Sequence, residues 1–200
     1  ISNFTFMKEL NNLSILSKDV GPGNCLIDSW IQKFTEEKFD KEGKISSRGS
    51  INKVILEQAL EVHENNFKNK DNISLDTNDF DISFVRGLSL EDGAATLTAF
   101  TAKVISSNIK NFLKNFNDNK LTILLCGGGR KNKNLIDHIK FNLNKNFILV
   151  NSDKFNINGD FIESQAFAYL AIRSIQSLPI SFPNTTGCSS PCSGGEIVHS

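Results

Sequence analysis

The sequence predicts an α/β fold, and three observations carry that prediction. Strand-like and helix-like patterns alternate from residue 121 onward, which implies a parallel portion of sheet. Two short β-prone runs at the start of the chain indicate a hairpin, and a long amphipathic stripe in between predicts a central helix. The chain has 200 residues, 39% of them hydrophobic, with no internal repeat and no Pro/Gly linker, so we expect one domain over residues 1–200.

The predicted hairpin lies at the beginning of the chain. Phe4 and Phe6 alternate with polar residues, and Leu13, Ile15 and Leu16 form a second apolar run after "KELNN". This spacing is typical of two strands joined by a short turn. The chain has no initiator Met and starts directly in strand-like sequence, so we expect it to be truncated within a sheet.

Helical periodicity accounts for the middle of the chain. After the "GPG" turn, apolar residues at helical spacing predict an amphipathic helix over 24–35, and a weaker pattern covers 50–67. Residues 68–82 are a loop by composition. A long helix is expected over 91–116, with Asp92 placed to cap it. Its buried stripe comprises Leu97, Phe100, Val104, Ile105, Ile109, Phe112 and Leu113.

The alternating part begins with "LTILLC" at 121–126, a buried strand by length and composition. A helix over 130–143 and a second strand over 147–150 follow. The last predicted helix, over 160–177, is apolar almost all round. Strands joined in this way are parallel, and their ligand crevice lies at their carboxyl ends.

Four single residues carry weaker expectations. Trp30 and Tyr169 lie in apolar helical stripes, so we expect both in the core. His63 and His138 have Lys and Asn neighbours on predicted helices, so we expect both imidazoles to be solvated.

Composition excludes several functional classes. The 22 Lys and Arg balance the 22 Asp and Glu, so no overall field recruits nucleic acid or an anionic membrane. No run of 18 apolar residues and no signal peptide is seen, which predicts a cytoplasmic protein. The four cysteines do not form a disulfide framework. Cys188 and Cys192 are the only close pair, and no second Cys/His pair completes a zinc site.

The most informative segment is the glycine turn Gly127–Gly129, between the strand at 121–126 and the helix at 130–143. A turn at this position offers free backbone N–H groups, and glycine lets a nucleotide approach the main chain. A tight turn without a ligand is the alternative. The dinucleotide fingerprint needs a glycine where Asn132 stands, and "GGGRKNKN" lacks the Gly-Lys-Ser/Thr of a phosphate-binding loop. Both named motifs are therefore excluded.

Five ordered blocks then carry a resemblance. They are "VGPGNCLIDSW" (20–30), "ATLTAFTAKVI" (95–105), "LLCGGGRKNKNL" (124–135), "INGDFIESQAFAYLAIR" (157–173) and "LPISFPNTTG" (178–187). Together they resemble the C-terminal half of the anhydro-N-acetylmuramic acid kinase family, in the sugar kinase, heat-shock 70 and actin superfamily. The resemblance spans essentially the whole chain.

The resemblance implies a ribonuclease-H-like (actin-like ATPase) lobe, with a mixed sheet, a β meander followed by a βαβα segment, and helices on both faces. The family's enzymes have two lobes and hold ATP with Mg²⁺ in the cleft between them. They open the 1,6-anhydro ring of anhydro-N-acetylmuramic acid with water and phosphorylate the 6-oxygen, giving N-acetylmuramic acid 6-phosphate in peptidoglycan recycling. This chain would be the C-terminal, ATP-binding lobe. Its implied partners are ATP, a small amino sugar and a possible second copy of the protein.

The resemblance also assigns nucleotide contacts. Gly127, Gly128 and Gly129 match the family's turn under the adenosine of ATP, and Asn132 matches the Asn that follows the turn. Asn3, in "ISN", matches the end of a glycine-containing phosphate loop. Together these residues form the expected cofactor-binding set.

The expected sugar-side set is Asn24, Asp28 and Glu163. Asn24 and Asp28 belong to the "GPGN" block that faces the family's cleft, but Asn24 is equally placed to cap a helix. Glu163 matches a Glu beside the sugar. It also lies three residues after Asp160, where the pair would form a capping box. Asp160 and Asp153 themselves are expected to be cap and loop residues.

Two departures limit the resemblance. The family's Ser-Thr-Gly-Arg-Glu stretch is replaced by "SLDTN" at 74–78, which loses the Arg. The resemblance places the catalytic Asp in the other lobe, so we assign no catalytic residue and no metal ligand here and expect the isolated chain to be inert. The alternative function is a stand-alone nucleotide-binding or interaction module of the same superfamily.

Overall fold

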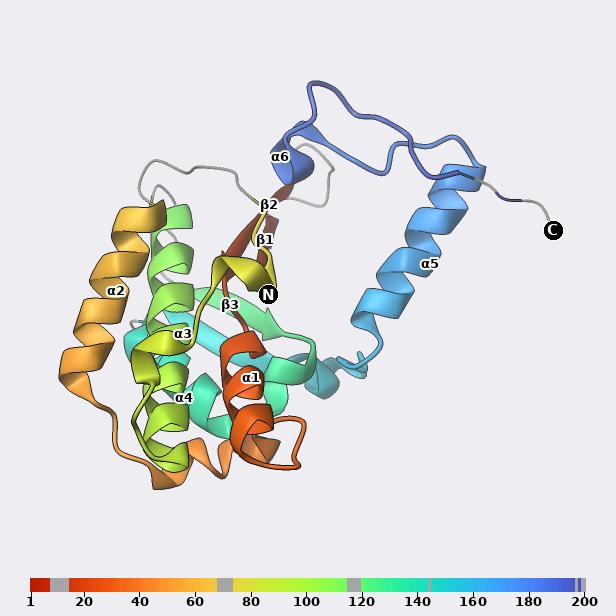
Figure 1. Cartoon of the computed structure of the whole chain (residues 1–200). Helices are drawn as coiled ribbons and strands as arrows, with labels where there is room; N and C mark the ends of the chain where they lie inside the picture. The colour runs from red at the N-terminus through yellow and green to blue at the C-terminus, as the bar shows by residue number, and fades with distance from the viewer. Residues whose placement is uncertain (8–14, 68–73, 115–119, 144, 197, 199–200) are drawn as a thin grey trace.

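The computed structural model describes residues 1–7, 15–67, 74–114, 120–143, 145–196 and 198. Most of these residues form a body around one long helix, and a C-terminal arm extends away from it (Figure 1). The arm then returns to the body through a short helix that packs beside the N-terminal hairpin.

The described strands and the first five α-helices agree in type and order with the predicted elements, whereas the short sixth helix was not predicted. The helices are α1 (Cys25–Phe34), α2 (Lys53–Phe67), α3 (Leu90–Phe112), α4 (Lys133–Asn142), α5 (Ile162–Ile175) and the short α6 (Pro183–Thr186). The strands are β1 (Ser2–Met7), β2 (Ile15–Gly21), β3 (Leu121–Leu125) and β4 (Phe147–Asn151). From residue 74 onward, the expected loop over 68–82 contains one 3₁₀ turn, at Thr77–Asp79.

The strands pair as two separate two-stranded sheets. β1 and β2 are antiparallel, and β3 and β4 are parallel, with Leu121 opposite Phe147 and Leu125 opposite Asn151. The mixture of parallel and antiparallel pairing is therefore confirmed. The described strands do not form the expected single sheet with a meander; the two pairs instead share one hydrophobic cluster with α3 and α4. The turn "KELNN" and Leu13 lie outside the described residues.

Helix α3 forms the centre of the body, between α2 and α4 in Figure 1. Its N-terminal half packs against α1 and α2, and its C-terminal half packs against the hairpin, β3, β4 and α4. Trp30 is 1% exposed and donates from Nε1 to the Leu90 carbonyl at 2.9 Å, which confirms its place in the core. Gly93 of α3 lies directly under the indole, since a Cβ there would stand 2.3 Å from the ring. The amphipathic stripe of α3 thus organises the fold.

The start of α3 differs from the prediction. The N-cap is Ser89, whose Oγ accepts from the Asp92 N–H at 3.1 Å. Asp92 lies within the first turn, and its carboxylate accepts from the Ser50 N–H at 2.8 Å. An Asp at this position complements the helix dipole without capping the helix. Residues 115 and 116, the expected end of the helix, lie outside the described residues.

Helix α5 differs most from its prediction. Its apolar sequence predicts burial, yet none of its residues is buried, and Figure 1 shows it standing away from the body. Phe167 is 66% exposed and Tyr169 is 59% exposed, so the expected core position of Tyr169 is wrong. Burial of an apolar helix requires a covering partner, which no described element provides. None of the described helices combines the length and apolarity needed to cross a membrane.

Candidate functional site

The glycine turn Gly127–Gly129 lies where β3 ends and leads through a 3₁₀ turn into α4. Gly127 has φ +74°, a conformation that disfavours any residue with a side chain, and its N–H donates to the Gly159 carbonyl at 2.9 Å. A Cβ on Gly127 or Gly128 would meet no described atom within 4 Å. Packing therefore does not demand a glycine at position 128, and the turn presents an open stretch of main chain.

The Arg130 side chain holds the turn in place. Its side chain is 3% exposed and forms two bonds with the Asp153 carboxylate, from Nε at 3.1 Å and from Nη2 at 3.2 Å. Nη1 donates to the Asp160 carboxylate at 2.7 Å and to the Gly127 carbonyl at 2.9 Å. One guanidinium therefore joins the glycine turn to the loop that connects β4 with α5.

The same network sets the charges around the turn. The Arg130 guanidinium and then the Lys131 ammonium lower the pKa of Asp160 to about 2. Hydrogen bonds from Arg130, and then from the Gly159 N–H, lower the pKa of Asp153, and the two carboxylates in return raise the pKa of Arg130. Gly159 is required by close approach, since a Cβ there would stand 2.5 Å from Nε of Arg130. All three groups are thus ionised at neutral pH.

Asn132 is the N-cap of α4. Its Oδ1 accepts from the Leu135 N–H at 3.0 Å, and the residue is 5% exposed. Gly43 packs on this cap, because a Cβ there would stand 2.5 Å from Oδ1. The side chain of Asn132 therefore shapes the exit of the turn through the helix start.

Asn24 is brought against the glycine turn. It occupies the N-cap position of α1, but its side chain makes no capping bond, so the capping alternative is wrong for the side chain. A Cβ on Gly129 would lie 3.7 Å from Nδ2 and 3.8 Å from Oδ1 of Asn24. The Oδ1 atom is buried and has no hydrogen-bond partner among the described residues. A buried amide oxygen without a partner beside an open glycine turn fits a site that receives a polar ligand.

Asn3 is the second residue of β1. It pairs with Asp19 across the β1–β2 ladder, and opposite residues of a ladder point to the same side. The "GPG" turn packs on the start of β1, because a Cβ on Gly23 would stand 3.3 Å from Ser2 N. Asp19 Oδ2 accepts from the Leu75 N–H at 2.7 Å, which ties the "SLDTN" stretch to the end of β2. The structure therefore places a carboxylate directly opposite Asn3.

Asp28 lies one helical turn after Asn24, on the same face of α1. Burial, and then the charge of Asp40, raises the pKa of Asp28 to about 6. Asp40 is itself 3% exposed and accepts from the Ile45 and Ser46 N–H groups at 2.7 and 3.0 Å. A half-buried carboxyl group with a raised pKa is a common feature of functional sites.

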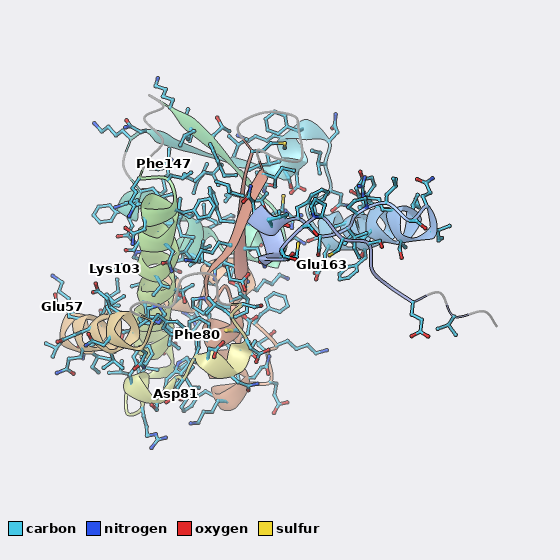
Figure 2. The ribbon with its side chains drawn as sticks, turned by 90° about the horizontal axis from the view of Figure 1, so that it is seen from above. Glu57, Phe80, Asp81, Lys103, Phe147 and Glu163 are labelled. Carbon is cyan, nitrogen blue, oxygen red and sulfur yellow. The ribbon has the colours of Figure 1, made fainter. Side chains whose placement is uncertain are left out.

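Glu163 lies in the first turn of α5, at the base of the arm (Figure 2). The expected capping box is wrong, because the N-cap is Phe161 and makes no side-chain capping bond. Asp160 is held by Arg130 and by Lys131 Nζ at 2.6 Å, so its carboxylate turns toward the glycine turn. Asp153 is a loop residue as expected, in a 3₁₀ turn after β4. Glu163 itself is exposed and lies three residues after Asp160 in the sequence.

These features fit a site for a polar ligand. The turn offers main chain without side chains, Asn24 offers an amide oxygen without a partner among the described residues, and Arg130 holds the turn through the Gly127 carbonyl. Among the described residues, no group of three His, Cys, Asp or Glu side chains is arranged to hold a metal ion.

Comparison with known proteins identifies the family of the chain. The family model for anhydro-N-acetylmuramic acid kinase matches residues 1–200. The chain belongs to the anhydro-N-acetylmuramic acid kinase family. A relative of that name from Pelagibacter ubique (strain HTCC1062) is 48% identical over 198 residues, which are 99% of this chain and 52% of the relative. Relatives from Zymomonas mobilis subsp. mobilis and Methylobacterium nodulans are 36% and 35% identical, over 98% of this chain and 52% and 50% of their own lengths.

The chain thus spans about half the length of the curated anhydro-N-acetylmuramic acid kinases it matches. Sequence reasoning did not single out Arg130, which holds the glycine turn, or Asp19, which lies opposite Asn3 in the β1–β2 ladder. The signal for Arg130 was available: Asp153 and Asp160 follow the strand that pairs in parallel with the strand before Arg130. Groups that follow neighbouring parallel strands meet at one edge of the sheet.

Proposed function

We propose that this chain is the C-terminal, ATP-binding lobe of a two-lobed sugar kinase that phosphorylates 1,6-anhydro-N-acetylmuramic acid with opening of the anhydro ring. The product would be N-acetylmuramic acid 6-phosphate, and the enzyme would act in the cytoplasm. The main support for ATP binding is the open main chain at Gly127 and Gly128. Arg130 holds this turn, and the buried Oδ1 of Asn24, which has no partner among the described residues, lies beside it.

The nucleotide would lie on this turn with its adenosine end. Gly127–Gly129 would support the base and ribose by close main-chain approach, and Asn24 Oδ1 would accept a hydrogen bond from a hydroxyl or amino group. Asn3 would lie toward the phosphates, at the start of the hairpin. ATP bound with Mg²⁺ would supply the phosphoryl group, and the magnesium would offset the charge on its oxygens.

The sugar side would be formed by Asp28 and Glu163 together with the other half of the protein. Ring opening also requires a base that orients the attacking water. The structure offers Asp19 for this role, because its carboxylate lies across the ladder from Asn3, next to the expected phosphate position. The base would then belong to this chain, and not to the other lobe, where the resemblance puts it.

A variant of the full two-lobed enzyme tests the role of Asp19. If Asp19 is the base, Asp19→Asn lowers kcat at least about 100-fold, the lower end of a general base's contribution, while KM for ATP changes little. A kcat close to that of the unchanged enzyme would return the base to the absent lobe.

The overall proposal is tested by joining this chain to the complementary half of the Pelagibacter ubique relative. We expect sugar-dependent release of ADP and a phosphorylated sugar from the joined protein, and none from this chain alone. Release of ADP without regard to the sugar would favour the alternative, a stand-alone nucleotide-binding module.

We also propose that the exposed apolar surface of α5 is covered in the assembled enzyme, either by the other lobe or in a homodimer. The exposed side chains Phe167, Tyr169 and Ile175 support this, because apolar patches of this kind mark interaction sites.

A further inference from the structure

A cavity of about 410 Å³ lies between α2, α3 and the segment over 79–84. Five aromatic rings line it, from His63, Phe67, Phe80, Phe84 and Phe100. The residues of the glycine-turn site do not belong to its lining. The cavity is therefore a second candidate site, separate from the proposed kinase chemistry.

The rings form one connected group. The His63 ring lies 4.5 Å from Phe67 and 5.9 Å from Phe80, with interplanar angles of 37° and 19°. Phe100 meets His63 edge-on at 5.6 Å, and Phe84 contacts Phe100 at 5.1 Å. The expectation that His63 is solvated is wrong, because these rings half-bury the imidazole, and burial lowers the pKa of His63. Burial therefore favours the neutral imidazole, whose ring adds to the aromatic lining.

Two carboxylates stand at the mouth of the cavity. Asp79 and Asp81 flank Phe80 in the sequence and both are exposed, whereas the Phe80 ring stacks on His63 of α2. Figure 2 labels Phe80 and Asp81. Asp81 accepts from the Ser83 N–H at 3.0 Å, and hydrogen bonding to Ser83 lowers the pKa of Asp81. The charge of Arg86, which does not line the cavity, also lowers the pKa of Asp81. Of the described residues that line the cavity, none is Lys or Arg.

A second cavity, of about 610 Å³ between α2, α3 and α4, provides a contrast. Its charged lining residues are Lys53, Glu57, Lys103 and Asp137, so cations and anions balance. Figure 2 labels Glu57 and Lys103, from α2 and α3. The charged lining residues of this cavity are of both signs, whereas those of the aromatic cavity are the carboxylates Asp79 and Asp81 alone.

We infer that the aromatic cavity between α2 and the segment over 79–84 binds a small organic ammonium ion, with the cation against the rings and the carboxylates of Asp79 and Asp81 at its mouth. Ring faces are the negative ends of aromatic quadrupoles, so they attract alkylated ammonium groups that are weakly hydrated. The carboxylates add long-range attraction and keep anions out. The apolar lining favours an ammonium that carries methyl or methylene groups over a hydrated metal ion.

Choline and its neutral isostere 3,3-dimethylbutan-1-ol test the inference on this chain. Both have the same shape, and only choline carries the charge. We follow the amide signals of Phe80 and Asp81 and the ring signals of His63 by NMR during titration with each compound. Choline should saturate these signals and bind at least about fivefold more tightly than the isostere, as expected for a partly desolvated cation–π contact.

Variants with matched controls locate the contact. Asp81→Asn should weaken choline binding about threefold or more without changing binding of the isostere, and Phe80→Leu should weaken choline binding while keeping an apolar side chain. The controls, Asp137→Asn and Phe141→Leu in the second cavity, should leave choline binding unchanged. Equal affinity for choline and the isostere would overturn the inference, as would choline shifts that appear only around the second cavity or no binding of choline at all. The comparison on the unchanged chain decides the matter even if a variant fails to fold.

Discussion

Replacement of Arg130 by Met should destabilise the chain and loosen the glycine turn together. The guanidinium makes three bonds to carboxylates and one to the Gly127 carbonyl, and its side chain is 3% exposed. Hydrogen bonds to charged groups each contribute about 1.5 to 3 kcal/mol. The Asp153 and Asp160 side chains are 48% and 42% exposed, so water compensates for much of what they lose. We therefore expect a loss of about 2 to 3 kcal/mol in the free energy of unfolding.

Urea denaturation followed by circular dichroism measures this loss, and hydrogen exchange of the Gly127 N–H reports the turn. The midpoint should fall with little change in the denaturant slope, and Gly127 should lose protection. Lys131→Met is the matched control. It removes the second cation that contacts Asp160, but Lys131 is 59% exposed, so its loss should change stability by no more than about 1 kcal/mol. Equal stability of the two variants would refute the network as the support of the turn.

The pH dependence of the Arg130 network has a defined sign. The pKa values of Asp160 and Asp153 are lowered by Arg130, and that of Asp160 falls to about 2. A carboxyl with a lowered folded pKa stabilises the protein above its unfolded pKa and loses that effect as the pH falls through the folded pKa. The stability difference between the unchanged chain and Arg130→Met should therefore shrink between about pH 4 and pH 2. A constant difference across this range would contradict the assignment.

Three further predictions follow from the geometry. Gly128→Ala should leave the free energy of unfolding unchanged or raise it by up to about 1 kcal/mol, while weakening ATP binding about tenfold. Gly127→Ala should cost about 1 to 2 kcal/mol of stability, because Gly127 has φ +74°. Chemical denaturation measures the stabilities, and calorimetry measures ATP binding. Because the pKa of Asp28 is raised to about 6, its charge opposes folding above that pH, so Asp28→Asn should raise Tm more at pH 7.5 than at pH 4.5, and equal shifts at both values would contradict this. Phe167→Ser, combined with Ile175→Ser, should lower self-association of this chain in sedimentation, and unchanged association would place the contact elsewhere.

Local pattern was sufficient for most of the fold. The stripe of α3 and the apolar spacing of α1 reflect which face of each helix meets the core, so Trp30 and Leu97 were predicted correctly as buried. The parallel pairing of β3 and β4 followed from the intervening α4. These features depend on residues that lie near each other in the sequence.

Features that depend on distant or absent partners were predicted less well. The all-round apolar sequence of α5 shows only that a partner is needed, and no described element of this chain buries the helix. His63 was expected to be solvated from its neighbours in sequence, but the ring of Phe80 covers it from a distant segment. Burial of a side chain depends on tertiary contacts that helical spacing alone does not contain.

In the candidate site, too, the local pattern was predicted and the contacts between distant residues were not. The glycine turn was visible as a pattern, but it is held by Arg130, whose carboxylate partners lie 23 and 30 residues away in the sequence. Asp160 was expected to cap α5 because capping needs only nearby residues, yet a buried guanidinium competes more strongly for its carboxylate. The side chain of Asn24 was similarly free to face the turn.

We propose that the glycine turn receives the adenosine end of ATP. Titration of this chain with ATP and Mg²⁺, followed by the amide signals of Gly127, Gly128 and Gly129 and the side-chain amide of Asn24, is the decisive measurement. We expect saturable shifts at these four residues, which adenosine alone should reproduce in part and Gly128→Ala should weaken. Shifts confined to residues away from the turn, or identical titrations of Gly128→Ala and the unchanged chain, would contradict it.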